Sequence, residues 1–505
     1  MRYSRIVFSM AGPFIFLLIV LGVACQTPAA NKSRKSYSLV PDEHGMILKA
    51  PDGRVVFRYM TKKPKVTNLA ANSVCCFHPL NTPSGERLTD LAPGDHHHHR
   101  GVFLAWHTMG FREKADFSSF GPLGPTYGWN ISRGDFWGWG EFAPTKGRVI
   151  NNREVKLVRA NAEVAEMKIR NDWVTNEKVM MTETTSAKLR EQDGVYVFDL
   201  DYKFTPVVDL ILNHTAFGGF CVRARNDGES YYATRDGKVL LPDPHYSVPE
   251  LNWPTANWYD YTIKLDNGKT IGCAVLDHPD NPPSTWHNPR YVWMVNPCIA
   301  AAGPFTVEKG DSLSLRYRLV VHDGPTPVDL LERLSNEWQT SSSAARFRLE
   351  RDFVRLDNGK DLAGWKGNMR DWSVVHGGIH LHYKSPPSGG VLFSEKPHSD
   401  NVIIRMQFRA TYAADSGVFV HGSQFQVRDY INSYPDTKKY APSCKPPGVW
   451  NDLEFDITNG VAVVRLNGTV IERAWKIGTR ANQGIGLQKE KADFDFRYIR
   501  LKEKK

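Results

Sequence analysis

The chain has 505 residues, 41% of them hydrophobic and 23% charged, and a formal net charge of +10 at pH 7. One hydrophobic core does not serve a chain of this length, so two or three domains are expected. Lysine and arginine are spread among acidic residues, and no basic helix or nucleic-acid-binding motif appears. The charge therefore predicts no nucleic-acid partner and favours at most a mild attraction to anionic polysaccharide or envelope surfaces.

The first residues have the pattern of an export signal. Arg2 and Arg5 precede an apolar run, residues 11–23, that ends at Gly22-Val-Ala-Cys25. Small residues before a cysteine resemble a bacterial lipobox, although Gly22 stands where leucine is usual, so ordinary signal-peptide cleavage stays open. We expect a signal peptide over 1–25, a lipid anchor to the membrane through Cys25, a polar tether over 26–43, and an exported protein in the periplasm or cell envelope. No later run has the ~18 apolar residues that a spanning helix needs.

Residues 44–338 are expected to form a large antiparallel β-sandwich domain that ends in a short helix. Short runs of β-branched and aromatic residues alternate with Gly, Pro, Asn and Asp, which is typical of sandwiches. For the helix, Thr326 is the predicted N-cap and Pro327 the first helical residue. The runs are Met46–Ala50, Val55–Tyr59, Val102–Trp106, Val155–Val158, Val195–Phe204, Lys238–Leu241, Tyr259–Leu265, Ile271–Val275 and Leu313–Val321. The six cysteines after Cys25 form no Cys-x-x-Cys pattern, and we expect free thiols.

A small, polar linker is predicted over 339–348, followed by a second β domain over 349–505. Gly377-Gly378 and Asn467-Gly468 each separate two alternating runs, and Asn-Gly is the strongest short hairpin signal. A jelly-roll sandwich fits this pattern. The fold class is therefore all-β, with two successive sandwiches.

The chemically richest stretch is a histidine run with acidic and basic neighbours. Clustered neutral imidazoles serve as metal ligands or as acids and bases near neutral pH. If the run is extended, His96 and His98 share one face, and we expect them to hold one divalent metal ion of unknown identity. Asp95 would orient them, and Arg100 would clamp an enolate or carboxylate. A hydrogen-bonded structural cluster and a solvated loop are the alternatives. The predicted catalytic residues are Asp95, His96, His98, His99 and Arg100.

A second loop, residues 277–290, again sets histidines and acids among prolines, and we expect it to complete the same site. It would contribute His278 and His287 to substrate binding, together with His78 from the segment before the histidine run. Tryptophans at positions 129, 137 and 139 stand in glycine-rich loops where flat indole faces can stack on sugar rings. Filling of the sandwich edges is the equally simple alternative for each tryptophan.

Ordered motifs in the second half resemble the 3-keto-disaccharide hydrolase family, which implies a concanavalin-like jelly roll that acts on glycosides oxidised at C3. The resemblance implies substrate binding by Gln424, Gln426, Asp429 and Trp450. Gln426 and Asp429 are retained from the family pattern and would hold sugar hydroxyls or a cation, and Trp450 would be a platform for the sugar. The chain departs from the family pattern at Gln424, where the family has Glu, at His421, where it has Arg, and at 489–490, Lys-Glu in place of Asp-His. The motifs are Phe353–Trp365, Asp415-Ser-Gly-Val-Phe-Val, Gln424-Phe-Gln-Val-Arg-Asp429, Lys445-Pro-Pro-Gly-Val-Trp-Asn451, Leu466-Asn-Gly, Gly484-Ile-Gly-Leu-Gln488 and Phe496-Arg-Tyr-Ile499.

Motifs in the first half resemble an uncharacterised family catalogued as methane oxygenase PmoA. They are His78-Pro-Leu, Thr82-Pro-Ser-Gly85, Asp95-His96, His98-His99-Arg100-Gly101, Asp277-His-Pro and Trp286-His287. The methane chemistry of that name is rejected, because a membrane oxygenase subunit needs several apolar spans. The strand pattern is similar to the galactose-mutarotase-type supersandwich, whose sites use histidines and acids on sugars, a comparison of fold alone.

These observations predict an exported carbohydrate-active protein that cleaves 3-keto-glycosides as a hydrolase or lyase. A C3 ketone acidifies the C2 proton, so a base can remove it and expel the C1 oxygen. Two alternatives stay open. The first alternative is a non-catalytic glycan-binding lipoprotein of the envelope, which the Gln424 departure favours. The second is a sugar epimerase or mutarotase.

Overall fold

The computed structural model describes residues 35–114, 129–239, 255–289, 291–342, 347–382, 390–432, 435–480 and 483–504. The predicted signal peptide, Cys25, tether residues 26–34 and linker residues 343–346 lie outside these ranges. Residues 35–505 belong to one compact unit. Within the described ranges, no helix is long and apolar enough to cross a membrane.

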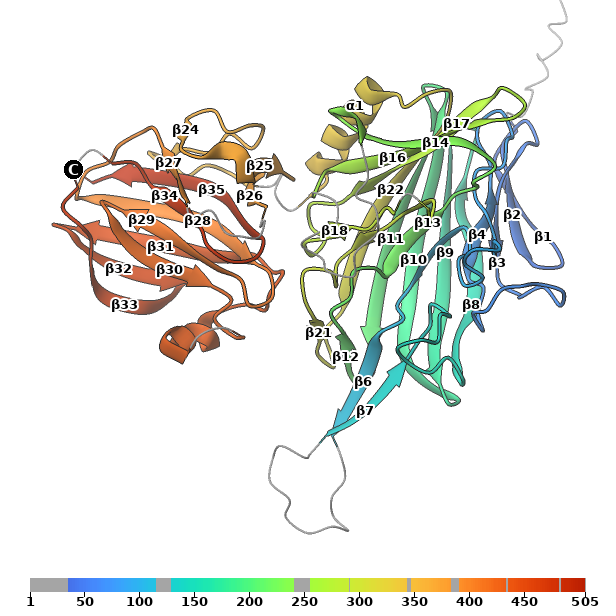
Figure 1. Ribbon diagram of the computed structural model, residues 1–505, viewed down its shortest axis with the longest axis horizontal. Helices are drawn as coiled ribbons and strands as arrows, with labels where there is room; N and C mark the ends of the chain where they lie inside the picture. The colour runs from blue at the N-terminus through green and yellow to red at the C-terminus, as the bar shows by residue number, and fades with distance from the viewer. Residues whose placement is uncertain are drawn as a thin grey trace, which may run out of the picture. The chain divides into compact units, whose positions relative to one another are not determined.

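The first half is built from two large antiparallel sheets (Figure 1). The seven-stranded sheet has the order β1 (Ser38–Pro41), β2 (Gly45–Lys49), β3 (Val55–Met60), β4 (Cys76–Leu80), β5 (Val102–Ala105), β13 (Gly219–Arg223), β19 (Met294–Val295). The nine-stranded sheet has the order β15 (Gly237–Val239), β14 (Gly228–Thr234), β16 (Trp258–Leu265), β17 (Thr270–Asp277), β22 (Leu313–Asp323), β11 (Val195–Pro206), β10 (Lys178–Gln192), β9 (Val164–Thr175), β8 (Arg148–Ala160).

The core of this half lies between the two sheets. Side chains of a strand alternate between its faces, and Phe57 of β3 stacks on Phe198 of β11 at 5.0 Å between ring centroids. The start of β11 is buried on both faces, because helix α1 (Val328–Thr340) covers the outer one with Leu331, Leu334 and Trp338.

Two smaller sheets complete the first half. Their orders are β21 (Phe305–Val307), β12 (Asp209–Leu212), β6 (Met109–Lys114), β7 (Trp129–Gly134), and β18 (Thr285–Trp286) with β20 (Pro297–Cys298). Each of the nine strand runs expected from the sequence overlaps a strand, although Ala50 and Trp106 lie one residue beyond the ends of β2 and β5. The six cysteines after Cys25 are free thiols, as expected.

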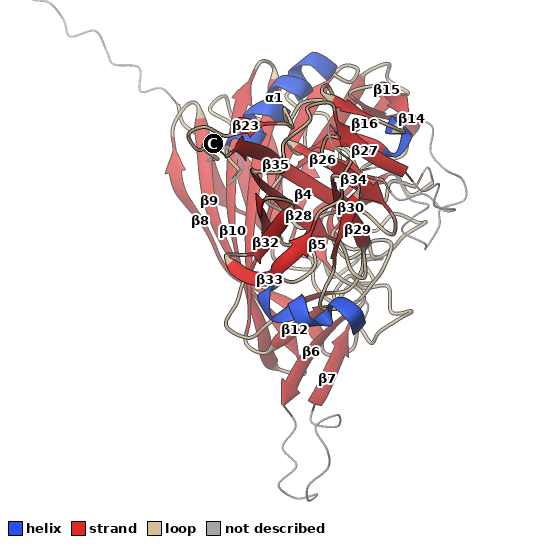
Figure 2. Cartoon of the chain, turned by 90° about the vertical axis from the view of Figure 1, so that its left-hand side faces the viewer, coloured by secondary structure: helices blue, strands red, loops and turns tan. Residues whose placement is uncertain are grey.

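The second half is a sandwich of two further antiparallel sheets with its own apolar core (Figure 2). One has the order β25 (Trp372–Val375), β26 (Gly378–Leu381), β35 (Phe494–Glu503), β28 (Val402–Ala410), β31 (Asn451–Thr458), β32 (Val461–Leu466), β33 (Thr469–Lys476), with β23 (Val354–Arg355) beside β35. The other has the order β24 (Trp365–Lys366), β27 (Gly390–Ser394), β34 (Gly486–Lys489), β29 (Asp415–Val420), β30 (Ser423–Arg428). Two 3₁₀ helices, η4 (Met369–Asp371) and η5 (Pro435–Ser443), lie in its connections.

The predicted start of the helix is wrong by one residue. Pro327 takes the N-cap position without a side-chain cap, and α1 begins at Val328. The Thr326 hydroxyl instead donates to the buried Asp260 carboxylate at 2.6 Å, and His322 lies 3.0 Å from the other oxygen of Asp260. A buried carboxylate such as that of Asp260 needs hydrogen-bond partners. The Thr326 hydroxyl therefore binds this carboxylate and does not cap the free amides at the start of the helix. The helix also includes the first two residues of the predicted linker. The domain boundaries stay a prediction.

We predict that docking of α1 contributes strongly to stability. Replacing the fully buried Leu334 with Ala leaves a cavity between helix and sheet and should lower the free energy of unfolding by about 2–5 kcal/mol. Glu337→Ala, on the exposed face of the same helix, should change it by less than about 0.5 kcal/mol. Urea denaturation followed by tryptophan fluorescence measures both. Equal effects of the two variants would contradict the packing of the helix.

Candidate functional site

The histidine run folds as two successive turns between β4 and β5, not as the extended segment we expected. The amide of His99 donates to the carbonyl of His96 at 3.0 Å. The His96 ring therefore stacks on His99 at 4.7 Å, and His98 meets the His99 ring edge-on at 4.6 Å. His98 and His99 are buried, whereas His97 is exposed. The predicted pairing of His96 and His98 on one strand face is thus corrected, because a turn brings residues three apart together.

Arg100 holds the loop and is not the predicted clamp for an enolate. Its guanidinium is buried and donates to four backbone carbonyls, those of Val74, His98, Phe136 and Trp137, at 2.7–3.2 Å. Donors committed in this way are not available to a substrate. Arg100 instead ties the histidine loop to the loop that carries Trp137.

Asp95 contacts His96, the residue that it was predicted to orient, but its main partner, Arg223, was missed. Its carboxylate lies 2.7 Å from Nδ1 of His96 and receives both terminal nitrogens of Arg223 on β13, at 2.8 and 2.9 Å. Burial alone would raise the pKa of Asp95, but the hydrogen bonds and charge of Arg223, with His96, outweigh it and hold this pKa below its usual value. Arg223 also lies 3.3 Å from Nδ1 of His99. Nothing in the sequence near Arg223 signalled this contact.

An aromatic surface adjoins the histidines. His98 lies 6.0 Å from Trp139, and His107 lies 5.6 Å from the same indole and 4.6 Å from Phe217, measured between ring centroids. His287 reaches Phe217 from the second loop at 5.0 Å. Trp139 is 37% exposed and Phe142, 5.1 Å from it, is 57% exposed. Trp137, in contrast, is fully buried and belongs to the core. The surface joins exposed rings to imidazole groups, the combination that suits a sugar ring and its hydroxyls.

The pKa values of His98, His99 and His107 lie below neutral pH, so these three imidazoles are uncharged there. Burial, with the charge of His96 next, lowers the pKa of His98 to about 3, and burial lowers that of His107 to about 4. Burial, followed by the nearby His98 and Arg223, holds the pKa of His99 far below its usual value. Groups with such low pKa values are weak bases. Their chemistry here is hydrogen bonding to hydroxyl groups rather than proton transfer.

The described residues do not assemble a set of three or more metal ligands around His96 and His98. The rings of His96 and His98 lie 5.5 Å apart between centroids, and His96 is turned toward Asp95. Among the described residues, no group of three or more His, Cys, Asp or Glu side chains is arranged to hold a metal ion. A zinc centre needs at least three protein ligands. A metal at His96 and His98 stays a prediction.

Two predicted site residues lie elsewhere. The ring of His78, on β4, lies 3.1 Å from the hydroxyl of Thr89. His278 lies at the end of β17, 2.7 Å from Arg316 and 3.0 Å from Ser341 after helix α1, and its pKa is lowered to about 4 by burial and then by Arg316. The second loop therefore divides, with His287 at the aromatic surface and His278 at the helix.

A polar row crosses the five-stranded sheet of the second sandwich. The amide of Gln424 on β30 donates to Gln426 at 2.8 Å and to Gln488 on β34 at 2.5 Å. Gln426 in turn donates to the carboxylates of Glu490, at 3.2 Å, and Asp415. The polar row, Gln424, Gln426, Gln488, Glu490 and Asp415, contains both predicted glutamines.

Gly417 explains how the row forms. It lies on β29 between the two strands, and a Cβ there would come within 2.6 Å of both the Gln424 nitrogen and the Gln488 oxygen. Only glycine lets these amides meet across the middle strand. Asp415 is buried, and Arg428 holds it at 2.9 Å, which fixes that end of the row.

Asp429 and Trp450 have structural positions, contrary to expectation. Asp429 is buried, and its two oxygens accept four hydrogen bonds at 2.9–3.2 Å from Ala413, Ile431 and Asn432, which shapes a turn. The Trp450 ring carries the guanidinium groups of Arg409 and Arg497 at 4.7 and 4.0 Å. The side chains of Asp429 and Trp450 are thus both engaged in contacts within the protein.

Fold and site together define an all-β protein of two successive sandwiches, each with a polar surface suited to sugars. Residues 49–336, more than half of the chain, match the model of a family of unknown function, DUF6807, and the chain belongs to that family. Residues 352–502 match the model of the 3-keto-alpha-glucoside-1,2-lyase-like domain, which confirms the resemblance seen in the second half. The name methane oxygenase PmoA is not confirmed for the first half. A search of curated proteins finds no match.

Several solved structures are similar to parts of the chain. A galactose mutarotase related enzyme from Lactobacillus acidophilus is 8% identical, with 57% of this chain and 97% of that chain covered and a TM-score of 0.25. A candidate glycosyl hydrolase from Parabacteroides distasonis is 17% identical, with 31% and 99% covered and a TM-score of 0.26. A Bacillus subtilis protein of unknown function with a galectin-like fold is 10% identical, with 30% and 94% covered and a TM-score of 0.24.

We predict that the protein loses stability as the pH falls from about 6.5 toward 4. The folded chain holds the pKa of His78, His107 and His278 at about 4, whereas the unfolded chain returns them to 6.5. In that window the unfolded state binds more protons, so the free energy of unfolding falls with pH, by at most about 3 kcal/mol for each imidazole. Urea denaturation at pH 7.5 and 4.5 measures the change.

Two variants isolate the contribution of an imidazole from that of the carboxylates. His107→Gln should reduce the difference in unfolding free energy between the two pH values, because a titrating buried group is removed. His97→Gln, at an exposed position, should leave the difference unchanged. A protein equally stable at both pH values would contradict the burial of neutral imidazoles.

Proposed function

We propose that this protein cleaves 3-keto-glycosides by elimination at the polar row of the second sandwich, with Glu490 as the base. The single observation that carries the proposal is the position of Glu490. Its carboxylate is partly buried and receives the Gln426 amide at 3.2 Å, at the end of a row of amides that can hold sugar hydroxyls. The matching 3-keto-alpha-glucoside-1,2-lyase-like model covers this whole sandwich.

The chemistry needs one base and a set of hydrogen-bond donors. The C3 ketone makes the C2 proton acidic, so the carboxylate of Glu490 takes that proton and an enolate forms. The C1–C2 double bond then forms as the C1–O bond breaks, and the leaving oxygen takes up a proton. The amides of Gln424 and Gln426 donate within the row in this structure. A bound substrate would take over some of these donors, which would then stabilise negative charge on the C3 oxygen, since preorganised donors are the main means of stabilising such an oxyanion.

The departures from the family pattern support a shifted base. Gln424 stands where the family has a carboxylate, and Glu490 stands where it has a histidine. Both side chains belong to one hydrogen-bonded row, joined through Gln426. The row therefore retains a carboxylate that is neither locked in an ion pair, as Asp415 is with Arg428, nor replaced by an amide.

The first sandwich contributes glycan binding in this proposal. Its neutral imidazoles and the exposed rings of Trp139 and Phe142 suit hydroxyl groups and the apolar faces of sugars. We place the protein outside the cytoplasm, in the periplasm or cell envelope, with a lipid anchor at Cys25. A membrane anchor would keep the two sandwiches near polymeric glycans.

A second candidate function is binding without cleavage at the same row. It is favoured by Gln424, because an amide does not accept a proton near neutral pH. Both candidates use the same side chains to hold the sugar. They differ in whether Glu490 carries out chemistry.

We predict that Glu490→Gln abolishes turnover but not binding. The amide keeps the size and a hydrogen-bonding oxygen but cannot take the C2 proton, so kcat on a 3-keto-disaccharide should fall by about 10²–10⁴. Calorimetry with the same variant should show binding within a few-fold of the natural protein. Product formation is followed by the appearance of the released sugar.

Glu395→Gln is the matched control, since Glu395 is exposed in the same sandwich, and it should leave kcat unchanged. Full turnover by Glu490→Gln would remove the assigned base. Heat of binding without product from the natural protein would favour the binding function instead.

A further inference from the structure

A polar groove of about 790 Å³ lies beside helix α1. Helix residues Asn336 and Gln339 line one side, and Asn358 and His376 of the second sandwich line the other. Ligand pockets commonly have volumes of 300–1,000 Å³, so the groove is large enough for more than a small ion. It shares no lining residue with the polar row or with the aromatic surface.

The groove is lined by groups that both donate and accept hydrogen bonds. Four side-chain amides, those of Asn257, Asn336, Gln339 and Asn358, belong to its walls. Its charges are nearly balanced, with the cations Arg235, Arg355 and Lys360 against the anions Glu332 and Asp361. Arg355 is already paired with Asp357 at 2.7 Å. Such a lining suits neutral hydroxyl groups better than it suits an anion or an apolar ligand.

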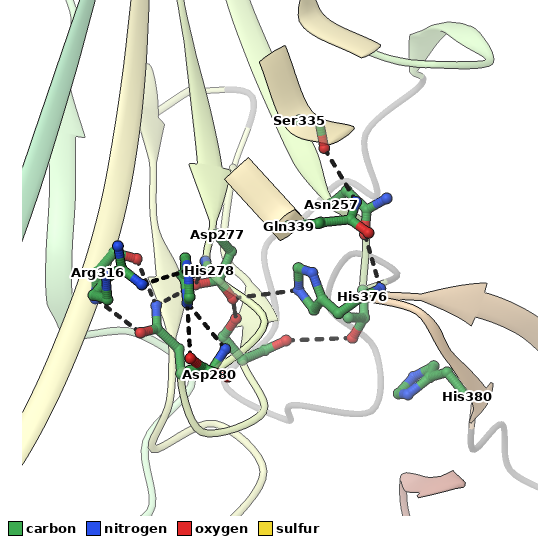
Figure 3. A network of polar contacts seen from close by, with 12 residues as sticks. Asn257, Asp277, His278, Asp280, Arg316, Ser335, Gln339, His376 and His380 are labelled. Carbon is green, nitrogen blue, oxygen red and sulfur yellow. Dashed lines mark hydrogen bonds and ion pairs between the residues drawn. The ribbon is translucent and has the colours of Figure 1, made fainter. Parts of the chain in front are cut away.

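His376 is an unexplained buried group in this wall (Figure 3). It occupies the turn between β25 and β26 with φ of 51°, and its backbone amide donates to Asn257 at 3.0 Å. The side chain is 9% exposed, its Nε2 lies 3.9 Å from the Asp277 carboxylate, and neither ring nitrogen has a hydrogen-bond partner among the described residues. Burial, then the charge of Arg409, lowers its pKa to about 3. A neutral imidazole thus offers one donor and one acceptor.

Tyr498 repeats this pattern in the same groove. It is 6% exposed and takes φ of 55°, and its hydroxyl has no hydrogen-bond partner among the described residues. Leaving a buried polar group unpaired costs about 1–3 kcal/mol. Two such groups lining one groove, each on a strained backbone, mark a place built to meet a ligand.

We propose that this groove is a second glycan site, which binds a neutral oligosaccharide segment through the amides of helix α1 and the imidazole and phenol of the second sandwich. The proposal goes beyond cleavage at the polar row and does not require it. A glycan held here would be bound by both halves of the chain, since helix α1 follows the last strand of the first half and His376 and Tyr498 belong to the second.

The test uses the full chain and two neutral probes, maltohexaose and cellohexaose, in titration calorimetry. Saturable binding of at least one probe is expected. Asn336→Ala combined with Gln339→Ala removes two hydrogen-bonding amides from one wall without touching either sandwich, and should weaken that binding at least about fivefold. The probe should also slow hydrogen exchange of segments 328–340 and 372–381.

The controls separate this site from the polar row. Asn213→Ala, at an exposed asparagine elsewhere in the first half, should bind the probe like the natural protein, and so should Glu490→Gln. Unchanged affinity in the helix double variant, no saturable binding of either probe, or displacement of the probe by millimolar inorganic phosphate would overturn the proposal. Loss of turnover in Glu490→Gln concerns only the proposed function, so the two proposals fail separately.

Discussion

Two buried guanidinium groups hold the histidine loop in place. Arg100 gives its donors to carbonyls of the loop and of the neighbouring Trp137 segment, and Arg223 reaches Asp95 and His99 from the adjacent strand. A buried cation without partners is costly, so each arginine demands the loop geometry that satisfies it. The positions of the imidazoles and of the exposed Trp139 follow from this demand. The arrangement of the surface therefore depends on two side chains whose hydrogen bonds are made within the protein.

The strand pattern of this protein could be predicted because it is local. Alternation along Val461–Leu466 and the Asn467-Gly468 turn specify a hairpin by themselves, and β32 and β33 form it. The double burial of β11 could not be predicted in this way, since it depends on a helix more than a hundred residues later. The start of helix α1 was predicted wrongly for the same reason, a contact with a residue far away in the sequence. The choice of Thr326 between a cap and Asp260 is settled by a carboxylate on β16.

The candidate site shows where residue type stops being informative. The sequence identified imidazoles, carboxylates and guanidinium groups, but it did not show which donors were already committed. Arg100 and Asp429 satisfy backbone groups, while the unnoticed Arg223 orients the predicted Asp95. His287 and His278, nine residues apart, lie in different networks, with His287 against Phe217 and His278 beside Ser341. Only the contacts, which are long-range, distinguish these roles.

The polar row of the second sandwich also depends on contacts between strands that are distant in the sequence. A strand places alternate residues on one face. Gln488, on β34, and Glu490, just after it, therefore share a face of the sheet, and they contact Gln424 and Gln426 of β30 across the middle strand β29. Under the proposed function, the carboxylate of Glu490 would take the place of the family's carboxylate at position 424, within the same hydrogen-bonded row. Lys489, which points away from the row, binds the Asp371 carboxylate at 2.5 Å, so its positive charge is compensated there rather than at Glu490. In the proposed elimination, Glu490 is the carboxylate of the row that could act as the base, because Asp415 is paired with Arg428.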